Sequence, residues 1–264
     1  DKYAVAVRKT DGEIVVKTEE YKGIVQNKKI RSLPIIRGVF SFIDSMVLGM
    51  STLTYSASFF MDEEEEEKDE KKESVMMGLT IACSVVMAVA IFMILPYFLS
   101  QLFRKFTDST TLITLLEGAV RLVIFFGYIL LISRMKDIQR VFMYHGAEHK
   151  CINCIEHGME LNVENVLKSS RLHKRCGTSF LFIVMIVSII FFLFIRIESP
   201  IWRVVFRLLL IPVIAGVSFE FIRLAGKSEN KLVIFLSKPG MMLQKLTTRE
   251  PDASMAEVAI ASVE

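Results

Sequence analysis

Residues 75–103, VMMGLTIACSVVMAVAIFMILPYFLSQLF, form a run of 29 residues without a charged side chain. A helix needs about 20 apolar residues to cross the hydrocarbon core of a bilayer, because each residue advances it by only about 1.5 Å. The run therefore predicts a transmembrane helix. Hydrophobic residues make up 52% of the 264-residue chain, above the roughly 45–50% of soluble domains. The class indicated is an integral membrane protein.

Three further apolar segments, 112–133, 176–195 and 201–224, predict three more spans, so that 75–133 holds the first two and 178–226 the last two. Glu117 and Arg121 are four residues apart, which places them on one helical face, and we expect them to pair and to point toward the bundle or a watery cavity. The last segment contains Pro212, which we expect to break it, together with Arg203, Arg207, Glu220 and Arg223.

The segment 31–61 is also apolar, but it carries Arg37 and Asp44. A charge at mid-membrane costs about 2.5–3.5 kcal/mol on insertion scales. We interpret this segment as an amphipathic or re-entrant helix rather than a fifth span. The acidic run within 62–74 is interpreted as a solvated linker.

At the start of the chain, residues 3–18 alternate apolar and polar side chains around Asp11-Gly12. This pattern predicts a β-hairpin within residues 1–30, because Asp-Gly accepts the positive φ angles of a tight turn. In the C-terminal segment 227–264, Pro239-Gly240 predicts a turn between two short interfacial helices. Thr247 or Thr248 could cap a further helix, and Pro251, Asp252 and Glu257 suit its start.

Eight Lys and Arg residues lie in 134–175, and short basic loops stay in the cytosol. Four spans then place both termini and the segment 134–177 in the cytosol, with the chain in the plasma membrane. The predicted fold is an all-α integral membrane bundle of about four transmembrane helices and one amphipathic or re-entrant helix. It carries a small cytosolic β-hairpin and a helical cap that bears His and Cys residues. The net charge of +3 gives no indication of nucleic acid binding.

All four histidines and three of the four cysteines lie between Tyr144 and Phe180. On a helix, His145 and His149 lie one turn apart on the same face and can both bind a metal ion. With Glu148 they give the order H-x-x-E-H, in which two histidines hold zinc and the glutamate is a base. His173 and Cys176, three residues apart, and the distant Glu220 are further candidate ligands.

Two alternatives use the same region differently. Cys151-x-x-Cys154 and His157 could form part of a closed structural zinc site. Without a metal, the polar residues would be hydrogen-bonded structure, with Lys150 and Arg175 contacting phosphate or lipid headgroups.

The motifs HGAEHK, LNVENV, HKRCGTSF, IPVIAGVSFEFIRLAG and PGMMLQKLTTREPDASMAEVAI, in this order, resemble the YqhQ-like family of bacterial membrane proteins. The resemblance covers nearly the whole chain and implies a metal-dependent enzyme without naming a reaction. Cys151, Cys154 and His157 are less typical of the family. Carried onto this chain, the resemblance singles out His145, Glu148, His149, Lys150, His173, Arg175, Cys176, Glu220, Thr247, Arg249 and Glu250.

The sequence thus predicts a metal site, most simply zinc, at the cytosolic membrane surface, and a metal-dependent hydrolase. His145 and His149 would bind the ion, Glu148 would act as base, and His173, Cys176 or Glu220 would complete the shell. Further candidate polar residues are Lys150, Arg175, Glu117, Arg121, Arg223, Arg249 and Glu250. The alternative is a non-enzymatic scaffold or accessory factor in membrane-protein biogenesis or lipid handling. Its partners would be the bilayer and other membrane proteins or translocation machinery.

Overall fold

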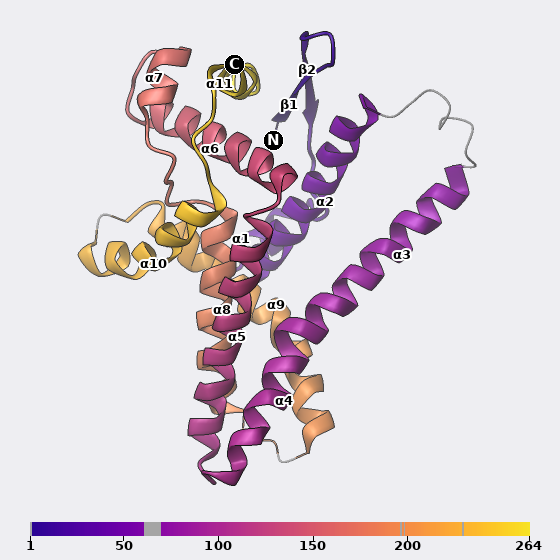
Figure 1. The fold of residues 1–264 in the computed structure, drawn as a ribbon, viewed down its shortest axis with the longest axis vertical. Helices are drawn as coiled ribbons and strands as arrows, with labels where there is room; N and C mark the ends of the chain where they lie inside the picture. The colour runs from indigo at the N-terminus through magenta and orange to yellow at the C-terminus, as the bar shows by residue number, and fades with distance from the viewer. Residues whose placement is uncertain (1, 61–69, 196, 198, 229) are drawn as a thin grey trace. The chain divides into compact units, whose positions relative to one another are not determined.

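The computed structural model describes residues 2–60, 70–195, 197, 199–228 and 230–264. In these residues the regular secondary structure is helical apart from one two-stranded sheet (Figure 1). Its elements are β1 (Lys2–Arg8), β2 (Ile14–Glu20), α1 (Lys28–Ser32), α2 (Ile36–Ser58), α3 (Glu70–Val89), η2 (Ala90–Ile94), α4 (Leu95–Gln101), η3 (Leu102–Lys105), α5 (Thr110–Ile132), α6 (Lys136–Glu156), α7 (Val163–Lys168), α8 (Gly177–Phe194), α9 (Pro200–Ala225), α10 (Lys231–Thr247) and α11 (Ala253–Ala261).

The chain divides into two compact units. The first comprises Asp1–Phe60, Ile129–Val184 and Ile211–Glu264, and the second comprises Met61–Tyr128 and Met185–Leu210. All residues of the candidate site described below belong to the first unit.

The predicted hairpin is confirmed. Strands β1 and β2 pair antiparallel, with Arg8 opposite Ile14, so the connecting loop has five residues. Gly12 alone in this loop has a positive φ, of 92°. Asp11 instead accepts a hydrogen bond from the backbone N–H of Glu13 at 2.9 Å, which fixes the turn from its side chain.

Asp44, the acidic residue of helix α2, has hydrogen-bond partners for its buried carboxylate. The carboxylate of Asp44 is buried and accepts hydrogen bonds from the Tyr21 hydroxyl at 3.0 Å, the Ile24 N–H at 2.8 Å and the Arg31 guanidinium at 3.1 Å. The segment that precedes α2 therefore offsets the cost of burying this charge.

Helices α2 and α9 of the first unit approach each other at two glycines. A Cβ atom on Gly38 would lie 2.8 Å from the carbonyl oxygen of Gly216, so neither position has room for a side chain. Arg37 directly precedes Gly38, and Glu220 lies one turn after Gly216. Arg37 donates two hydrogen bonds to the Glu220 carboxylate, both 2.5 Å long. This bidentate pair satisfies two charges that the sequence places in separate apolar segments.

The second unit begins its described part with a long helical run. Helix α3 starts at Glu70, inside the acidic stretch that we interpreted as a linker; residues 62–69 of that stretch lie outside the described residues. Glu and Lys are good helix formers, which accounts for the early start. The run continues through a π-helical turn, η2, just before Pro96, where the missing proline N–H interrupts the regular hydrogen bonding.

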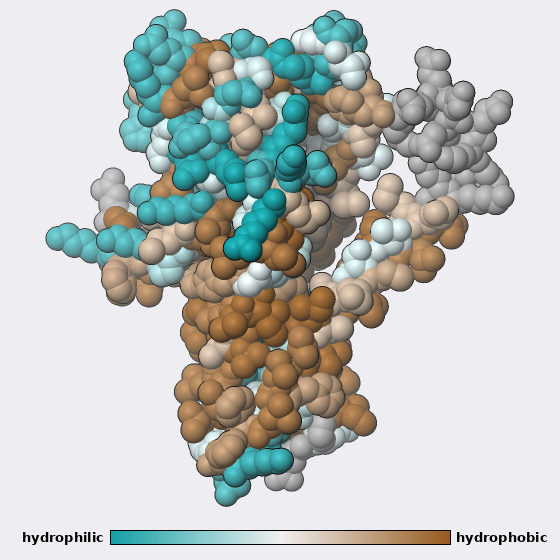
Figure 2. All heavy atoms as spheres, in the orientation of Figure 1, coloured by the Kyte–Doolittle hydropathy of each residue, from teal (hydrophilic) through white to brown (hydrophobic). Residues whose placement is uncertain are grey.

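Within the described part of the chain, five helical segments are long and apolar enough to cross a membrane by length and composition: Ile36–Ser58, Val75–Lys105, Thr110–Ile132, Gly177–Phe194 and Ile201–Ala225. The four predicted spans all correspond to such helices. Ile36–Ser58, the helix within the segment 31–61, also meets this criterion, with the lowest hydropathy of the five. Its interpretation as an amphipathic or re-entrant helix therefore stays a prediction. The apolar helices indicate a membrane protein, and in Figure 2 hydrophobic residues cover α3 and α4, whereas hydrophilic residues gather over α7 and the hairpin.

The expected breaks at two prolines are not present. Helix α9 continues through Pro212, and α10 continues through Pro239, so the predicted turn at Pro239-Gly240 is wrong. At this point α10 packs closely on α8, because Gly240 lies against Ser179, where a Cβ would come within 3.1 Å of the serine Cβ. Helix α11 is present as predicted, but its cap is Asp252 rather than Thr247 or Thr248. The Asp252 side chain accepts from the Met255 N–H at 2.9 Å, whereas Thr248 caps the end of α10.

A small core joins α6, α7 and α11 in the first unit (Figure 1). Ala147, Cys151 and Cys154 form one face of α6, and Val166 and Ala256 pack against them. Strand β1 also contacts α11, where Arg8 pairs with Glu257 at 2.7 Å. The two ends of the described chain are therefore held together on this cap.

Candidate metal centre

The site is built on α6, which displays two imidazoles on one face. His145 and His149 are one turn apart, and their ring centroids lie 4.4 Å from each other. His149 is buried and His145 is partly buried. The opposite face of the helix carries Ala147, Cys151 and Cys154 into the core, so the burial of that face fixes the direction of the histidines.

Each imidazole is oriented by a backbone carbonyl. His145 Nδ1 lies 2.9 Å from the Thr247 oxygen, and His149 Nδ1 lies 2.7 Å from the Arg171 oxygen. A carbonyl can only accept, so each Nδ1 carries the proton in the neutral ring and each Nε2 keeps a free lone pair. This arrangement is typical of histidines that bind a metal through Nε2.

Cys176 brings a sulfur to the same point. It directly precedes α8, and its Sγ lies 3.2 Å from His145 Nε2 and 3.2 Å from the Thr178 hydroxyl. One potential ligand atom each from His145, His149 and Cys176 lies within 4.8 Å of the other two. Among the described residues, no fourth His, Cys, Asp or Glu joins this group.

The electrostatics favour a thiolate at this position. Burial raises the pKa of Cys176, but its hydrogen bonds with His145, His149 and Thr178 outweigh this effect and lower the pKa to about 5. Burial lowers the pKa of His145, while its hydrogen bond with Cys176 raises it, and the net shift is upward. The start of α8 also favours negative charge, because the first N–H groups of a helix are unpaired.

The loop that delivers Cys176 is held through its own carbonyl groups. Lys150 donates to the oxygens of Leu167 and Ser169, each at 2.8 Å. Asn153 donates to the oxygens of Ser170 and Leu172, at 2.7 and 3.1 Å. The polar side of α6 thus anchors almost the whole loop.

A second anchor comes from α10. The fully buried Gln244 accepts from the His173 N–H at 2.8 Å and donates to the His173 oxygen at 2.7 Å. The same amide donates to the Ser179 hydroxyl at 2.7 Å. Gln244 therefore fixes the backbone on both sides of Cys176.

The segment after α10, Thr247 to Glu250, crosses α6 at Gly146. The Arg249 N–H donates to the Phe142 oxygen at 2.8 Å, and a Cβ on Gly146 would overlap the Arg249 oxygen. A glycine at this position allows the backbone approach that places the Thr247 oxygen against His145.

The structure brings three of the five predicted ligands together and places the other two elsewhere. His173 is buried three residues before Cys176, but its Nε2 faces Glu156 at 3.2 Å and its Nδ1 accepts from the Arg175 N–H at 3.3 Å. Glu220 is paired with Arg37. Glu148, the predicted base, is exposed on α6, between the two histidines in sequence.

The remaining candidate residues of the first unit form ion pairs, bond to the backbone or are exposed. Lys150 pairs with Glu250 at 3.0 Å and Arg175 pairs with Glu156, while Arg249 donates to the Ser133 oxygen at 2.9 Å. Arg223 is exposed near the end of α9.

In the second unit, Glu117 binds Arg121 at 2.9 Å, as predicted, and also Arg207 at 2.6 Å. All three side chains are almost fully buried, and Arg121 reaches Ser188 at 2.9 Å. The pair predicted from spacing is therefore part of a larger polar cluster inside apolar helices.

The alternative thiol site is not assembled. Cys151 and Cys154 are fully buried on the core face of α6, and burial raises the pKa of Cys151 to about 12. His157 is exposed, with its Nδ1 2.7 Å from the Asn153 oxygen. These residues stabilise the cap and point away from the three converging ligands.

Several residues that build the site were not predicted, namely Gly146, Asn153, Arg171, Thr178 and Gln244. Arg171 acts through its backbone oxygen, which no side-chain pattern indicates. Asn153 does carry a signal, since it follows His149 by four residues and so lies on the same helical face.

The donor set fits a divalent metal ion. Two neutral imidazoles and one thiolate are ligands that zinc prefers, and zinc is bound tetrahedrally with one position left open in catalytic sites. The carbonyl partners on both Nδ1 atoms and the low pKa of the thiol provide what such a site requires.

Comparisons with known proteins agree on one family. Residues 33–264 match the family described as "Protein of unknown function (DUF1385)". The chain is 36% identical over 271 residues to "Uncharacterized protein YqhQ" of Bacillus subtilis (strain 168), an alignment that covers 98% of this chain and 85% of that relative. No solved structure matches the chain. The chain therefore belongs to the YqhQ-like, DUF1385 family of proteins.

Proposed function

We propose that this protein holds one divalent metal ion, zinc, through His145 Nε2, His149 Nε2 and Cys176 Sγ. The observation that carries the proposal is the convergence of these three ligand atoms within 4.8 Å of one another. The orientation of both rings by carbonyl oxygens supports it, because Nε2 is then the free nitrogen in each.

The proposed activity is hydrolysis at the membrane surface. A zinc ion with an open position supplies a water of lowered pKa and polarises a carbonyl or phosphoryl oxygen. Cys176 and the two histidines hold the ion, and Lys150, Asn153 and Gln244 keep the Cys176 loop in place. Glu148 stays the proposed base, since it is solvent-accessible on the same helix as both histidines.

The proposed location is the cytosolic surface of the bacterial plasma membrane. The hairpin contacts α11, and α11 contacts α6, so these elements lie on one side of any membrane. Between the hairpin and α6 the chain contains three candidate spans, and an even number must cross to return to the same side. This parity supports a non-crossing α2, the least apolar of the three. The eight basic residues of 134–175 favour the cytosol for this side.

Metal analysis of the purified full chain tests the proposal. After preparation with zinc, the wild-type protein should carry about one equivalent, whereas His145→Ala, His149→Ala and Cys176→Ala should each lose most of it. His157→Ala is the matched control, because it removes an exposed histidine from the end of the same helix, and it should retain the ion. Wild-type protein without bound metal would overturn the proposal.

Two further measurements separate binding from hydrolysis. In cobalt-substituted protein, a sulfur-to-cobalt charge-transfer band should be present and should disappear in Cys176→Ser. Glu148→Gln should keep the ion and lose turnover, and a variant that keeps its turnover would remove Glu148 from the mechanism while leaving the metal site intact. A non-enzymatic scaffold in membrane-protein biogenesis stays the alternative prediction from the sequence.

A further inference from the structure

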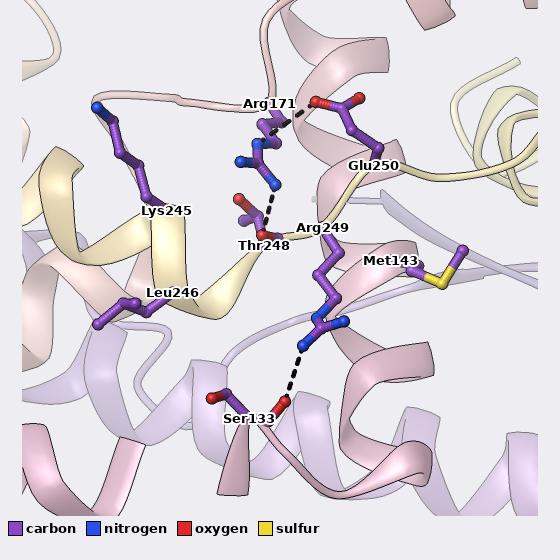
Figure 3. Close-up of a pocket in the computed structure, with 8 residues that line it drawn as sticks. All are labelled: Ser133, Met143, Arg171, Lys245, Leu246, Thr248, Arg249 and Glu250. Atoms are coloured by element: carbon purple, nitrogen blue, oxygen red, sulfur yellow. Dashed lines mark hydrogen bonds and ion pairs between the residues drawn. The ribbon is translucent and has the colours of Figure 1, made fainter. Parts of the chain in front are cut away.

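A cavity of about 490 Å³ lies in the first unit (Figure 3). Its walls come from α6, the end of α10, the segment that crosses α6, the residue after α5, and the Cys176 loop. The lining residues are Ser133, Met143, Arg171, Lys245, Leu246, Thr248, Arg249 and Glu250.

The charge of this cavity is strongly positive. Arg171, Lys245 and Arg249 contribute three cations, and Glu250 contributes the single carboxylate. That carboxylate is shared, since it lies 3.5 Å from Arg171 Nε and 3.0 Å from the buried Lys150 Nζ. The site therefore has more positive charge than its own acidic residue can balance.

The two guanidinium groups keep unused donors. Arg171 gives one N–H to the Thr248 oxygen at 2.8 Å, and Arg249 gives one to the Ser133 oxygen at 2.9 Å (Figure 3). These bonds fix the guanidinium groups to the backbone without neutralising them. A guanidinium has five N–H donors in a planar fork that matches phosphate oxygens, and Lys245 adds a mobile ammonium group.

The cavity has room for more than an inorganic anion. Its volume falls in the range of about 300–1,000 Å³ that small-molecule sites occupy. Met143 and Leu246 line it with apolar surface, which suits the carbon portion of an organic phosphate. Ser133 directly follows α5, one of the candidate spans, so the cavity opens close to the end of an apolar helix.

We propose that this cavity binds a phosphate-bearing group, either the headgroup of an anionic phospholipid or a small soluble phosphate ester. The proposal goes beyond the metal site and does not depend on it. The two sites are connected through neighbouring backbone segments. The carbonyl oxygens of Arg171 and Thr247 hold the imidazoles, and Arg171 and Thr248 line the cavity. A ligand in the cavity would thus contact Arg171, whose backbone oxygen orients His149.

Calorimetry on the detergent-purified full chain tests the soluble source, with sn-glycerol 3-phosphate and inorganic phosphate as probes and a chelator present, so that no bound metal can account for binding. For the lipid source, the chain is reconstituted into nanodiscs of phosphatidylcholine, and its co-flotation is measured with phosphatidylcholine vesicles that contain or lack phosphatidic acid. Binding in the calorimeter identifies a soluble ester. Co-flotation only with vesicles that contain phosphatidic acid, without binding in the calorimeter, identifies a lipid headgroup.

Lys245→Gln and Arg249→Gln should each weaken binding about tenfold, since each removes one charge-assisted contact. Lys238→Gln is the matched control, because this exposed lysine lies two turns earlier on α10 and does not line the cavity. Absence of binding in both arms would overturn the proposal, as would an equal loss in Lys238→Gln. Since Lys245 is exposed, its variant keeps the test valid even if Arg249→Gln fails to fold.

Discussion

The Nδ1 atom of His145 donates a hydrogen bond to the carbonyl oxygen of Thr247, which lies 102 positions later in the chain. The contact joins the site helix to the segment that crosses it. Through it, the geometry of the candidate metal centre depends on residues that contribute no metal-binding atom.

Gly146→Ala should disrupt this crossing. A methyl group at this position would overlap the Arg249 oxygen, and we expect a loss of about 1–3 kcal/mol in unfolding free energy together with weaker zinc binding. Unfolding in detergent and metal content are the measurements. Gly49→Ala is the control, because a Cβ at Gly49 meets nothing within 4 Å and alanine is the better helix former. Equal stability of the two variants would contradict the prediction.

Lys150→Met should destabilise the cap by about 1.5–3 kcal/mol, because it removes charged hydrogen bonds to the oxygens of Leu167 and Ser169 and leaves both acceptors buried. Lys168→Met removes an exposed pair with Glu164 and should leave the unfolding free energy nearly unchanged, because solvent screens such a pair. Denaturant unfolding of both variants measures the difference. The prediction is wrong if Lys150→Met is no less stable than Lys168→Met.

Glu117→Gln should cost about 3–5 kcal/mol, because it leaves the guanidinium groups of Arg121 and Arg207 buried without a counter-charge. Thermal unfolding in detergent measures this loss, with the exposed Glu160→Gln as control. Adding Arg207→Met to Glu117→Gln should recover part of the stability, since one unpaired charge is then removed. A double variant no more stable than Glu117→Gln would argue against charge burial as the cause.

A non-crossing α2 predicts a specific labelling pattern in intact cells. A cysteine at Ser58, the last residue of α2, should be protected from a membrane-impermeant maleimide, whereas one at Asp108, between two candidate spans, should react. Replacing Cys83, the exposed natural cysteine, with serine lowers the background. Labelling of Ser58→Cys together with protection of Asp108→Cys in intact cells would contradict the prediction, because a crossing α2 and a reversed orientation both give that pattern.

Much of the secondary structure follows from local sequence. Apolar length alone locates the long helices, because a span needs a fixed number of residues whatever its neighbours are. The turn at Asp11-Gly12 and the cap at Asp252 are also local. The break expected at Pro239 fails because the packing of Gly240 against Ser179 is a contact between helices that the residues near the proline do not reveal.

Local sequence predicts only part of the candidate site. The spacing of His145 and His149 predicts a shared helical face, since both residues lie on one element. Whether His173 or Cys176 meets them depends on how the loop is anchored, and carbonyl contacts with Asn153 and Gln244 decide that in favour of the cysteine. Glu220 is unavailable because Arg37, 183 residues away in sequence, pairs with it.

The pairing of Arg8 with Glu257 has a consequence for biosynthesis. The hairpin is synthesised before its partner α11, and all five candidate spans of the described residues lie between the two. Thr247, which orients His145, also follows these five helices. A nascent chain therefore has no complete cap until its apolar helices have been made, and the geometry of the candidate metal centre is completed only after them.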